Sequence, residues 1–191
     1  MKTKLCTLVA LLPLAIATTV LAQQQTFHIN PDSSTVDFTL ASHDTVKGTF
    51  HVENGTIHFD RASNSISGAV VVTAGSGKTG NDSRDKKMTN EVLNAPQFAD
   101  IAFVPKSYSG KIPASGDSDI EVSGVFTLHG TPHDLTVPMH LHIDGAKCTA
   151  TAHIVVPYVQ WGLKDPSIFI LKVAKQVDVN LSFVGFLTPA P

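Results

Sequence analysis

The chain has 191 residues, with 14 Lys or Arg and 16 Asp or Glu, so its formal net charge is −2 at neutral pH. Without Lys2 and Lys4, which lie in the N-terminal segment described next, 12 basic and 16 acidic side chains remain, a net charge of −4. This length suits one domain with a real core. The negative balance argues against binding to nucleic acid and against electrostatic docking on anionic lipid.

The N-terminal segment has the parts of a secretory signal peptide. A short basic start precedes an apolar run over residues 5–21, and Val20-Leu21-Ala22 fits the small-residue cleavage pattern. We expect cleavage after residue 22, a mature domain over residues 23–191, no stable membrane anchor after cleavage, and a periplasmic or secreted location. The alternative is an uncleaved anchor helix, which Pro13 and the modest apolar length disfavour.

The first half of the mature chain alternates apolar and polar residues, which predicts strands over residues 26–29, 36–40, 46–52 and 66–72. Asn54-Gly55 is typical of a two-residue hairpin turn. That turn would place Val52 opposite Ile57 and Phe50 opposite Phe59 on the apolar face. His51 would then face His58 on the other side.

Residues 82–93 form the one segment with convincing helical spacing. Met88, Val92 and Leu93 fall on one face, and the charged residues before them can remain in water. Asp82 is the expected N-cap, with Asp85 in the capping-box position. Pro96 ends the segment, because a proline disfavours helix in the residue before it.

The second half returns to strands. A strand begins at Ile101 and leads into a Gly-, Pro- and Ser-rich stretch over residues 106–118, which we expect to be a mobile loop. Turn residues at 130–132 and at Asp144-Gly145 separate the strands that follow. Apolar alternation predicts those strands over residues 120–128, 135–143, 148–154 and 177–183, with an irregular segment over residues 157–167 before the last.

Roughly eight strands at hairpin spacing and one helix predict an all-β fold, an antiparallel barrel or sandwich whose helix closes one end. The faces expected to point inward carry no charge, and four inward positions are small. These features favour a hollow barrel, since about eight strands can hold one small ligand when some inward side chains are small. The alternative is that Phe50 and Phe126 fill the space. The small positions are Gly68, Gly124, Ala150 and Ala152.

No residue pattern predicts catalysis or a metal site. The chain has nine histidines, and His140 and His142 share a strand face, but that face is opposite the apolar stripe and therefore meets solvent. Cys148 is the one cysteine of the mature chain, so an intramolecular disulfide is excluded and a small buried side chain is the favoured interpretation. We expect neither a cofactor nor enzyme activity.

Several motifs resemble the YceI-like family. The central signature is carried by Arg84-Asp85-Lys86-Lys87-Met88, then Glu91-Val92-Leu93 and Ile101-x-Phe103. Val46-x-Gly48-x-Phe50 precedes it, and Val122-x-Gly124-x-Phe126-Thr127-Leu128-His129-Gly130 follows. The resemblance covers essentially the whole mature chain. It implies an exported, lipocalin-like barrel that encloses a polyisoprenoid or a similar lipid, such as a quinone tail.

The apolar inner faces and this resemblance together predict a lipid carrier or sequestering protein. The open alternatives are a secreted metal-dependent enzyme acting on a small apolar substrate and a ligand-free stress or structural module. Both a monomer and a homodimer are compatible with the sequence. The predicted lining residues are Val36, Phe38, Phe50, Val70, Val72, Phe126, Met139, Leu141 and Phe183, with Met88, Leu93, Phe98 and Phe103 capping one end.

Three further residues are expected near the opening of the barrel. Trp161, the one tryptophan, either packs beside the opening or belongs to the ordinary core. Arg84 and Asp85 either meet a polar head group there or form a structural ion pair at the start of the helix. The structural interpretation is the favoured one.

Overall fold

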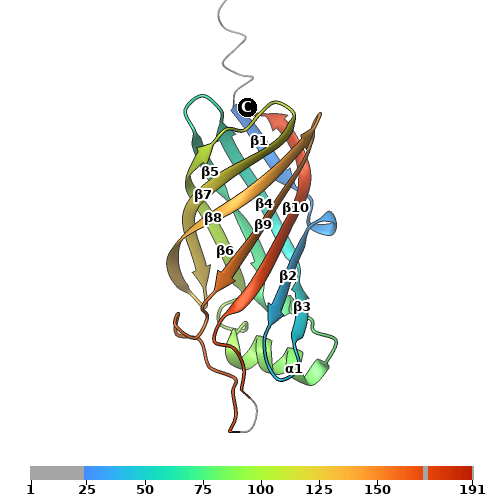
Figure 1. Ribbon diagram of the computed structural model, residues 1–191, viewed down its shortest axis with the longest axis vertical. Coiled ribbons are helices and arrows are strands. Elements are labelled where there is room, and N and C mark those ends of the chain that lie inside the picture. Colours follow the sequence, from blue (N-terminus) through green and yellow to red (C-terminus); the bar gives the residue numbers. More distant parts are fainter. Residues whose placement is uncertain (1–23, 170–171, 191) are drawn as a thin grey trace, which may run out of the picture.

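The computed structural model describes residues 24–169 and 172–190. The predicted signal peptide, residues 1–22, lies outside them. Ten antiparallel strands form one sheet in the order β1-β4-β5-β6-β7-β8-β9-β10-β2-β3, and pairing of β1 with β10 closes it into a barrel (Figure 1). The strands are β1 (Gln24–Ile29), β2 (Thr35–Leu40), β3 (Val46–Phe50), β4 (Val52–Asp60), β5 (Ser65–Thr73), β6 (Asp100–Gly110), β7 (Gly116–Leu128), β8 (Thr131–Asp144), β9 (Lys147–Val156) and β10 (Val177–Pro189).

Two of the positions around the barrel are each occupied by two successive strands. β1 and β2 both pair with β10, through Ile29 with Gly185 and then Thr35 with Ser182. β4 pairs with β1, and β3 pairs with β2, so β3 and β4 also follow one another along a single position. The ten strands therefore occupy eight positions, which confirms the predicted antiparallel barrel of about eight strands.

The predicted hairpin at Asn54-Gly55 is wrong. β4 continues through both residues and pairs with β5, with a register irregularity between Val52 and Asn54. A Cβ on Gly55 would lie 2.6 Å from Cδ1 of Ile29, so this glycine permits close packing inside the barrel. The expected pairs across the turn do not form, and His58 pairs with Thr26 of β1 instead of with His51.

The predicted mobile loop over residues 106–118 is also wrong. β6 extends to Gly110 and β7 begins at Gly116, which leaves only residues 111–115 between them. Tyr108 is buried, and its hydroxyl donates a hydrogen bond of 2.9 Å to the carbonyl oxygen of Asp60. Ile112 of the short connection is buried as well. These contacts order a segment whose composition is that of a loop.

The two other predicted turns form, but each is displaced by one residue: the first is at residues 129–130 instead of 130–132, and the second at residues 145–146 instead of Asp144-Gly145. Leu128 pairs with Thr131 across His129-Gly130, and both turn residues have positive φ, 52° and 71°. Such backbone angles are those of a two-residue hairpin turn, and glycine adopts them readily. Gly145-Ala146 joins β8 to β9, with Asp144 paired to Lys147 across the turn, and of these two turn residues only Gly145 has positive φ, 59°.

The predicted helix is confirmed at the lower end of the barrel in Figure 1, with a different cap. α1 (Asp82–Lys87) continues as a π-helical turn, Met88–Val92, in which the amide of Leu93 donates to the carbonyl of Met88. Asn81 is the N-cap, because its side chain accepts a hydrogen bond from the amide of Arg84. Within the described residues, no helix is long and apolar enough to cross a bilayer.

Candidate functional site

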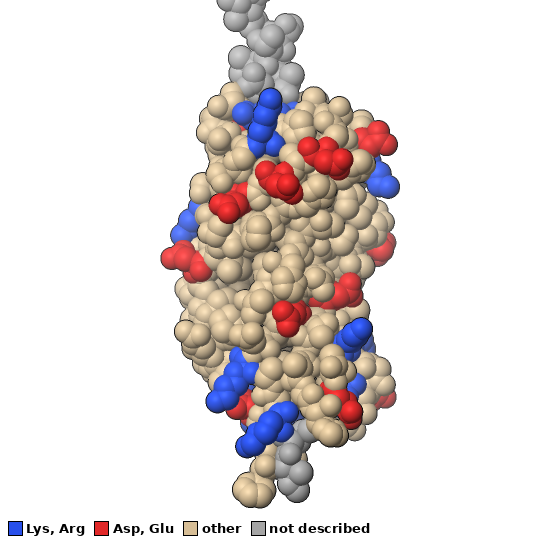
Figure 2. Space-filling model, viewed as in Figure 1, with Lys and Arg blue, Asp and Glu red and all other residues tan. Residues whose placement is uncertain are grey.

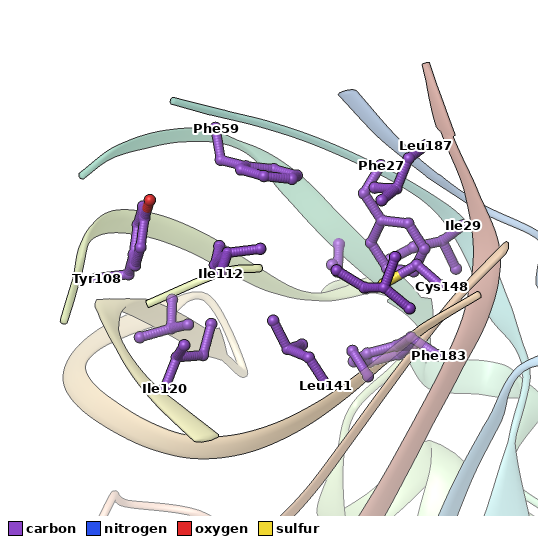
Figure 3. Close-up of a cluster of buried hydrophobic side chains, with 14 of the residues drawn as sticks. Phe27, Ile29, Phe59, Tyr108, Ile112, Ile120, Leu141, Cys148, Phe183 and Leu187 are labelled. Carbon is purple, nitrogen blue, oxygen red and sulfur yellow. The ribbon is translucent and has the colours of Figure 1, made fainter. Parts of the chain in front are cut away.

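The interior of the barrel contains a cavity of about 500 Å³. Apolar side chains line most of it, and they come from all ten strands and from the helical segment. Figure 3 shows a cluster of buried apolar side chains that includes the cavity-lining residues Leu141, Phe183 and Cys148. The volume lies within the range of about 300–1,000 Å³ that is typical of small-molecule sites.

The end of the barrel opposite the helix is sealed. Phe59 and Ile112 are buried there, and the Arg61 side chain packs over the Phe59 ring at 5.4 Å from its centroid. Nε of Arg61 also donates a hydrogen bond of 3.1 Å to the carbonyl of Ile112. Burial lowers the pKa of Arg61, which is nevertheless a permanently charged group at neutral pH. This guanidinium holds the short connection after β6 across the end.

The mouth of the cavity lies at the helical end. Of the described residues that line the cavity, only Asp44, Arg84 and Lys87 are exposed, and they come from the β2–β3 connection and from α1. Pro166 and Val173 complete the rim from the connection between β9 and β10. The deeper wall carries no charged side chain among the described residues. A ligand with an apolar body and a polar end would therefore place the polar end here.

A salt bridge ties two elements of the rim together. Nζ of Lys164, in the β9–β10 connection, lies 2.7 Å from Oε2 of Glu91 in the π-helical turn. The hydrogen bond and the positive charge of Lys164 hold the pKa of Glu91 below its ordinary value. The contact is exposed, so it positions the two segments more than it stabilises the fold.

Arg84 and Asp85 do not form the predicted ion pair, because Thr79 lies between them. Nε of Arg84 donates to Oγ1 of Thr79 at 2.8 Å, and that hydroxyl donates to Oδ1 of Asp85 at 2.5 Å. Asp85 is buried and also accepts from the amide of Thr79 at 2.8 Å. Asp85 therefore fixes the loop before α1 and does not line the cavity, whereas Arg84 does.

Twelve of the fourteen predicted apolar site residues line the cavity. The twelve are Val36, Phe38, Phe50, Val70, Val72, Met88, Leu93, Phe103, Phe126, Met139, Leu141 and Phe183. Strand alternation identified most of them correctly because every second side chain of a barrel strand points inward. The helical residues Met88 and Leu93 cover the lower end, as their spacing predicted.

Phe98 and Trp161 do not line the cavity. The Phe98 ring lies 4.3 Å from the ring of His129, in the turn between β7 and β8, so it covers the outside of the rim. The Trp161 ring stacks on His133 with a centroid distance of 4.0 Å and an angle of 10°. Trp161 also lies 5.8 Å from Phe126, which does line the cavity. Phe98 is therefore corrected to packing on the rim, and Trp161 packs beside the opening, one of its two expected positions, without lining the cavity.

The small inward residues contribute unequally to the cavity. Ala150 lines it and is 4% exposed, as predicted. Gly124, by contrast, does not enlarge the cavity. The ring of Phe103 packs against it, since a Cβ on Gly124 would lie 2.8 Å from Cζ of Phe103. Gly68 has a φ of 111°, and a Cβ there would meet the carbonyl oxygen of Thr56. The two glycines serve packing and backbone geometry, and the cavity persists beside them.

Sequence reasoning missed the lining residues outside the regular alternation. Tyr158 and Leu163 lie in the irregular β9–β10 connection, both are buried, and both line the lower part of the cavity. The Tyr158 hydroxyl donates to the carbonyl of Ala174 at 2.7 Å, and burial raises its pKa to about 12. No periodic signal marks such residues. Lys87 at the mouth was also missed, although its place in the helical segment beside Met88 was a usable signal.

The histidines predicted to be ordinary surface groups are exposed on the outer face. Nδ1 of His140 lies 2.8 Å from Oδ1 of Asp119, and Nδ1 of His142 lies 2.7 Å from Oδ1 of Asp117. The part of the chain that the structure describes contains no group of three His, Cys, Asp or Glu side chains arranged to hold a metal ion. A histidine-bound metal would require a third ligand close to His140 and His142, and the described residues do not provide one. Cys148 is buried in the cavity wall.

Comparison with known proteins identifies the fold. The YceI-like domain matches residues 27–185. The chain belongs to the YceI-like family. No curated protein matches the sequence significantly.

Solved structures share this YceI-like fold at low sequence identity. Burkholderia cenocepacia BcnA has a TM-score of 0.67 at 20% identity, over 82% of this chain and 99% of that one. A polyisoprenoid binding domain from Saccharophagus degradans, implicated in plant cell wall breakdown, has a TM-score of 0.63 at 13% identity, over 86% of this chain and 98% of that one. The Campylobacter jejuni YceI protein has a TM-score of 0.58 at 20% identity, over 75% and 85%.

Proposed function

We propose that this YceI-like protein is an exported binding protein that encloses a long isoprenoid-type lipid, a polyisoprenoid or a quinone tail, for transport, storage or sequestration. The observation that carries the proposal is the apolar cavity, sealed at one end and open between α1 and the β9–β10 connection. The similar Saccharophagus degradans domain is described as polyisoprenoid-binding, which supports the same class of ligand.

Apolar burial alone supplies enough affinity for such a ligand. Each buried methylene contributes roughly 0.8 kcal/mol, so ten of them contribute about 8 kcal/mol before the cost of ordering the chain. A net free energy of about 8 kcal/mol would correspond to a dissociation constant of about 1 μM, so burial beyond the first ten methylenes must offset the ordering cost. A branched isoprenoid chain has many such groups and also fits a wall made largely of aliphatic and aromatic side chains.

The polar end of the ligand would remain at the mouth. Arg84 already donates two hydrogen bonds to Thr79, at 2.8 and 2.9 Å, so its guanidinium is held in place before any ligand enters. Lys87 adds a second positive charge on the next turn of the helix, and Asp44 adds one negative charge on the facing side. This rim suits a polar or anionic end and leaves the wall below it apolar.

Mass spectrometry of an organic extract tests the proposal directly. Protein purified without detergent should release a long-chain isoprenoid, and the delipidated protein should take up a quinone analogue. Repeated absence of lipid together with no uptake would refute the proposal and favour a ligand-free module. Metal analysis of the same preparation tests the alternative that the protein is a metal-dependent enzyme. That alternative requires a bound metal and a loss of activity in His140→Ala.

Export is tested separately by the mature N-terminus. Cleavage after residue 22 should leave Gln23 as the first residue, in protein recovered from the periplasm or the medium. Intact-mass measurement distinguishes this from an uncleaved chain retained in the membrane. The lipid-binding proposal does not depend on this result.

A further inference from the structure

The β9–β10 connection, residues 157–176, presents two apolar side chains to solvent beside the cavity mouth. Phe169 is 96% exposed and Ile168 is 57% exposed. The other exposed large apolar side chains, Val104, Val155 and Phe186, lie on barrel strands and are 41–51% exposed. One exposed apolar side chain is ordinary, but Ile168 and Phe169 are adjacent, and neighbouring exposed apolar side chains rimmed by polar residues are typical of a surface that meets another apolar environment.

The base of this connection is firmly held. Leu163 is buried, and the hydroxyl of Tyr158 anchors the returning chain through Ala174. Nearer the tip, the amide of Ser167 donates to Asp165 at 2.9 Å, and Oγ of Ser167 accepts from the amide of Val173 at 3.0 Å. Ile168 and Phe169 are therefore presented by a structured base at the helical end of the barrel, which is the lower end in Figure 1.

Positive charge is concentrated in the segments around the mouth. Residues 41–45, 78–91 and 164–175 together carry seven Lys or Arg against five Asp or Glu, a net charge of +2. The predicted mature chain carries −4, so its remaining residues carry −6. Lys172 and Lys175 follow the apolar tip in the chain and are exposed. Figure 2 shows Lys or Arg side chains on the lower part of the molecule near the tip, with some Asp or Glu side chains among them, and both kinds of charge on the upper part as well.

We propose that the helical end docks reversibly on an anionic bilayer, with Ile168 and Phe169 entering the interfacial region and the surrounding lysines and arginines facing lipid head groups. An apolar tip flanked by cations is the combination that peripheral membrane binding requires. The overall negative charge does not oppose this arrangement, because charges more than a Debye length of about 8 Å away are largely screened at physiological salt.

Docking in this orientation turns the mouth toward the membrane. Pro166 and Val173, on either side of the apolar tip, line the cavity themselves. A lipid could then pass between bilayer and barrel without crossing water. This transfer step rests on the proposed function, whereas docking itself does not.

Vesicle co-sedimentation of the full mature chain tests the docking. Vesicles of phosphatidylcholine with phosphatidylglycerol should bind the protein, and vesicles of phosphatidylcholine alone should bind it at least about tenfold more weakly. The double variant I168S/F169S should reduce binding to the anionic vesicles by a similar factor. Phe186→Ser is the matched control, because Phe186 is 51% exposed on β10 near the opposite end and should not affect binding.

A charge reversal tests the electrostatic part. K172E/K175E should weaken binding and reduce its dependence on salt, whereas Lys147→Glu, at the start of β9, should change neither. Circular dichroism establishes that each variant is folded. Equal binding by wild type and I168S/F169S, or no binding to anionic vesicles, would overturn the proposal.

Two further readouts separate this proposal from its alternatives. If the wild type is a dimer in solution and I168S/F169S is a monomer, the tip meets a second copy of the chain and the membrane proposal is wrong. Extracted lipid is measured in parallel. Lipid present without vesicle binding overturns docking alone, and vesicle binding without any lipid overturns the proposed function alone.

Discussion

A large side chain introduced at a cavity-lining position would distinguish a hollow barrel from a packed one. Ala150 is 4% exposed, lies on β9 and lines the cavity. Ala150→Phe would add a ring of about six carbons to this space. The ring would occupy the space of about six methylene groups of the ligand. At roughly 0.8 kcal/mol per buried methylene, the ligand would lose up to about 5 kcal/mol of its binding free energy. Because the ligand can shift toward the mouth, we expect about half of that to be lost, which is roughly a fifty-fold weaker binding of a quinone analogue.

The stability of the same variant provides the second measurement. A ring that enters an empty apolar space gains contacts, so the free energy of unfolding in urea should fall by less than about 1 kcal/mol. Inserting the ring into a packed core would instead cost about 1–3 kcal/mol. Thr151→Phe is the matched control, since Thr151 is the next residue on β9 and is not among the cavity-lining residues.

Two outcomes would refute this reasoning. Unchanged affinity in Ala150→Phe would mean that the ligand binds elsewhere. A loss of stability above about 1 kcal/mol, with Thr151→Phe unaffected, would mean that the interior near β9 has no room for a ring.

Three further predictions concern buried and paired groups. Asp85→Asn removes the charged acceptor of Thr79, so the free energy of unfolding should fall by about 1–3 kcal/mol in urea denaturation, with lipid loading retained. Burial raises the pKa of the Cys148 thiol to about 11, so a thiol reagent at pH 8 should label the folded protein very slowly, more slowly still with bound lipid, and rapidly in denaturant. The hydrogen bond to Asp119 raises the pKa of His140 above its ordinary value of 6.5. The stabilisation from this pair should be fully present below pH 6.5 and be lost as pH rises through the folded-state pKa, which NMR titration of the imidazole measures.

Each of these three predictions has its own control. Asp82→Asn changes an exposed carboxylate in the same helical turn as Asp85 and should leave stability nearly unchanged. Fast labelling of Cys148 in the folded state would contradict its burial. His140→Asn should abolish the pH-dependent contribution, and an imidazole pKa at or below the ordinary value would show that the pair does not persist in solution.

The sequence was most informative where the physical rule is local. Alternation of apolar and polar residues identified inward-facing residues such as Phe38 and Leu141, because strand geometry fixes which side chains share a face. Helical spacing placed Met88 and Leu93 at one end of the cavity for the same reason. Gly130 lies in both the predicted and the observed turn, because a tight hairpin requires positive φ, which glycine adopts readily.

Local rules were wrong where a distant residue determined the outcome. Asn54-Gly55 resembles a hairpin turn, but both residues lie inside strand β4. The glycine is there because the Ile29 side chain packs so close to the backbone of Gly55 that a Cβ would clash with it. Phe98 and Trp161 are large aromatic residues near the mouth, and their positions depend on His129 and His133, which belong to other segments. No periodicity in the sequence encodes such contacts.

By itself, therefore, the sequence determined the class of fold, the inward faces of the strands and the helix at one end, since short-range geometry sets all three. Only the tertiary structure decided which end is open and which is sealed. The pairing of β1 with β10 closes the barrel across nearly the whole described chain, and the hydrogen bond from Arg61 to the connection after β6 seals one end. The mouth, the position of Arg84 on it and the exposed apolar tip beside it follow from these long-range contacts.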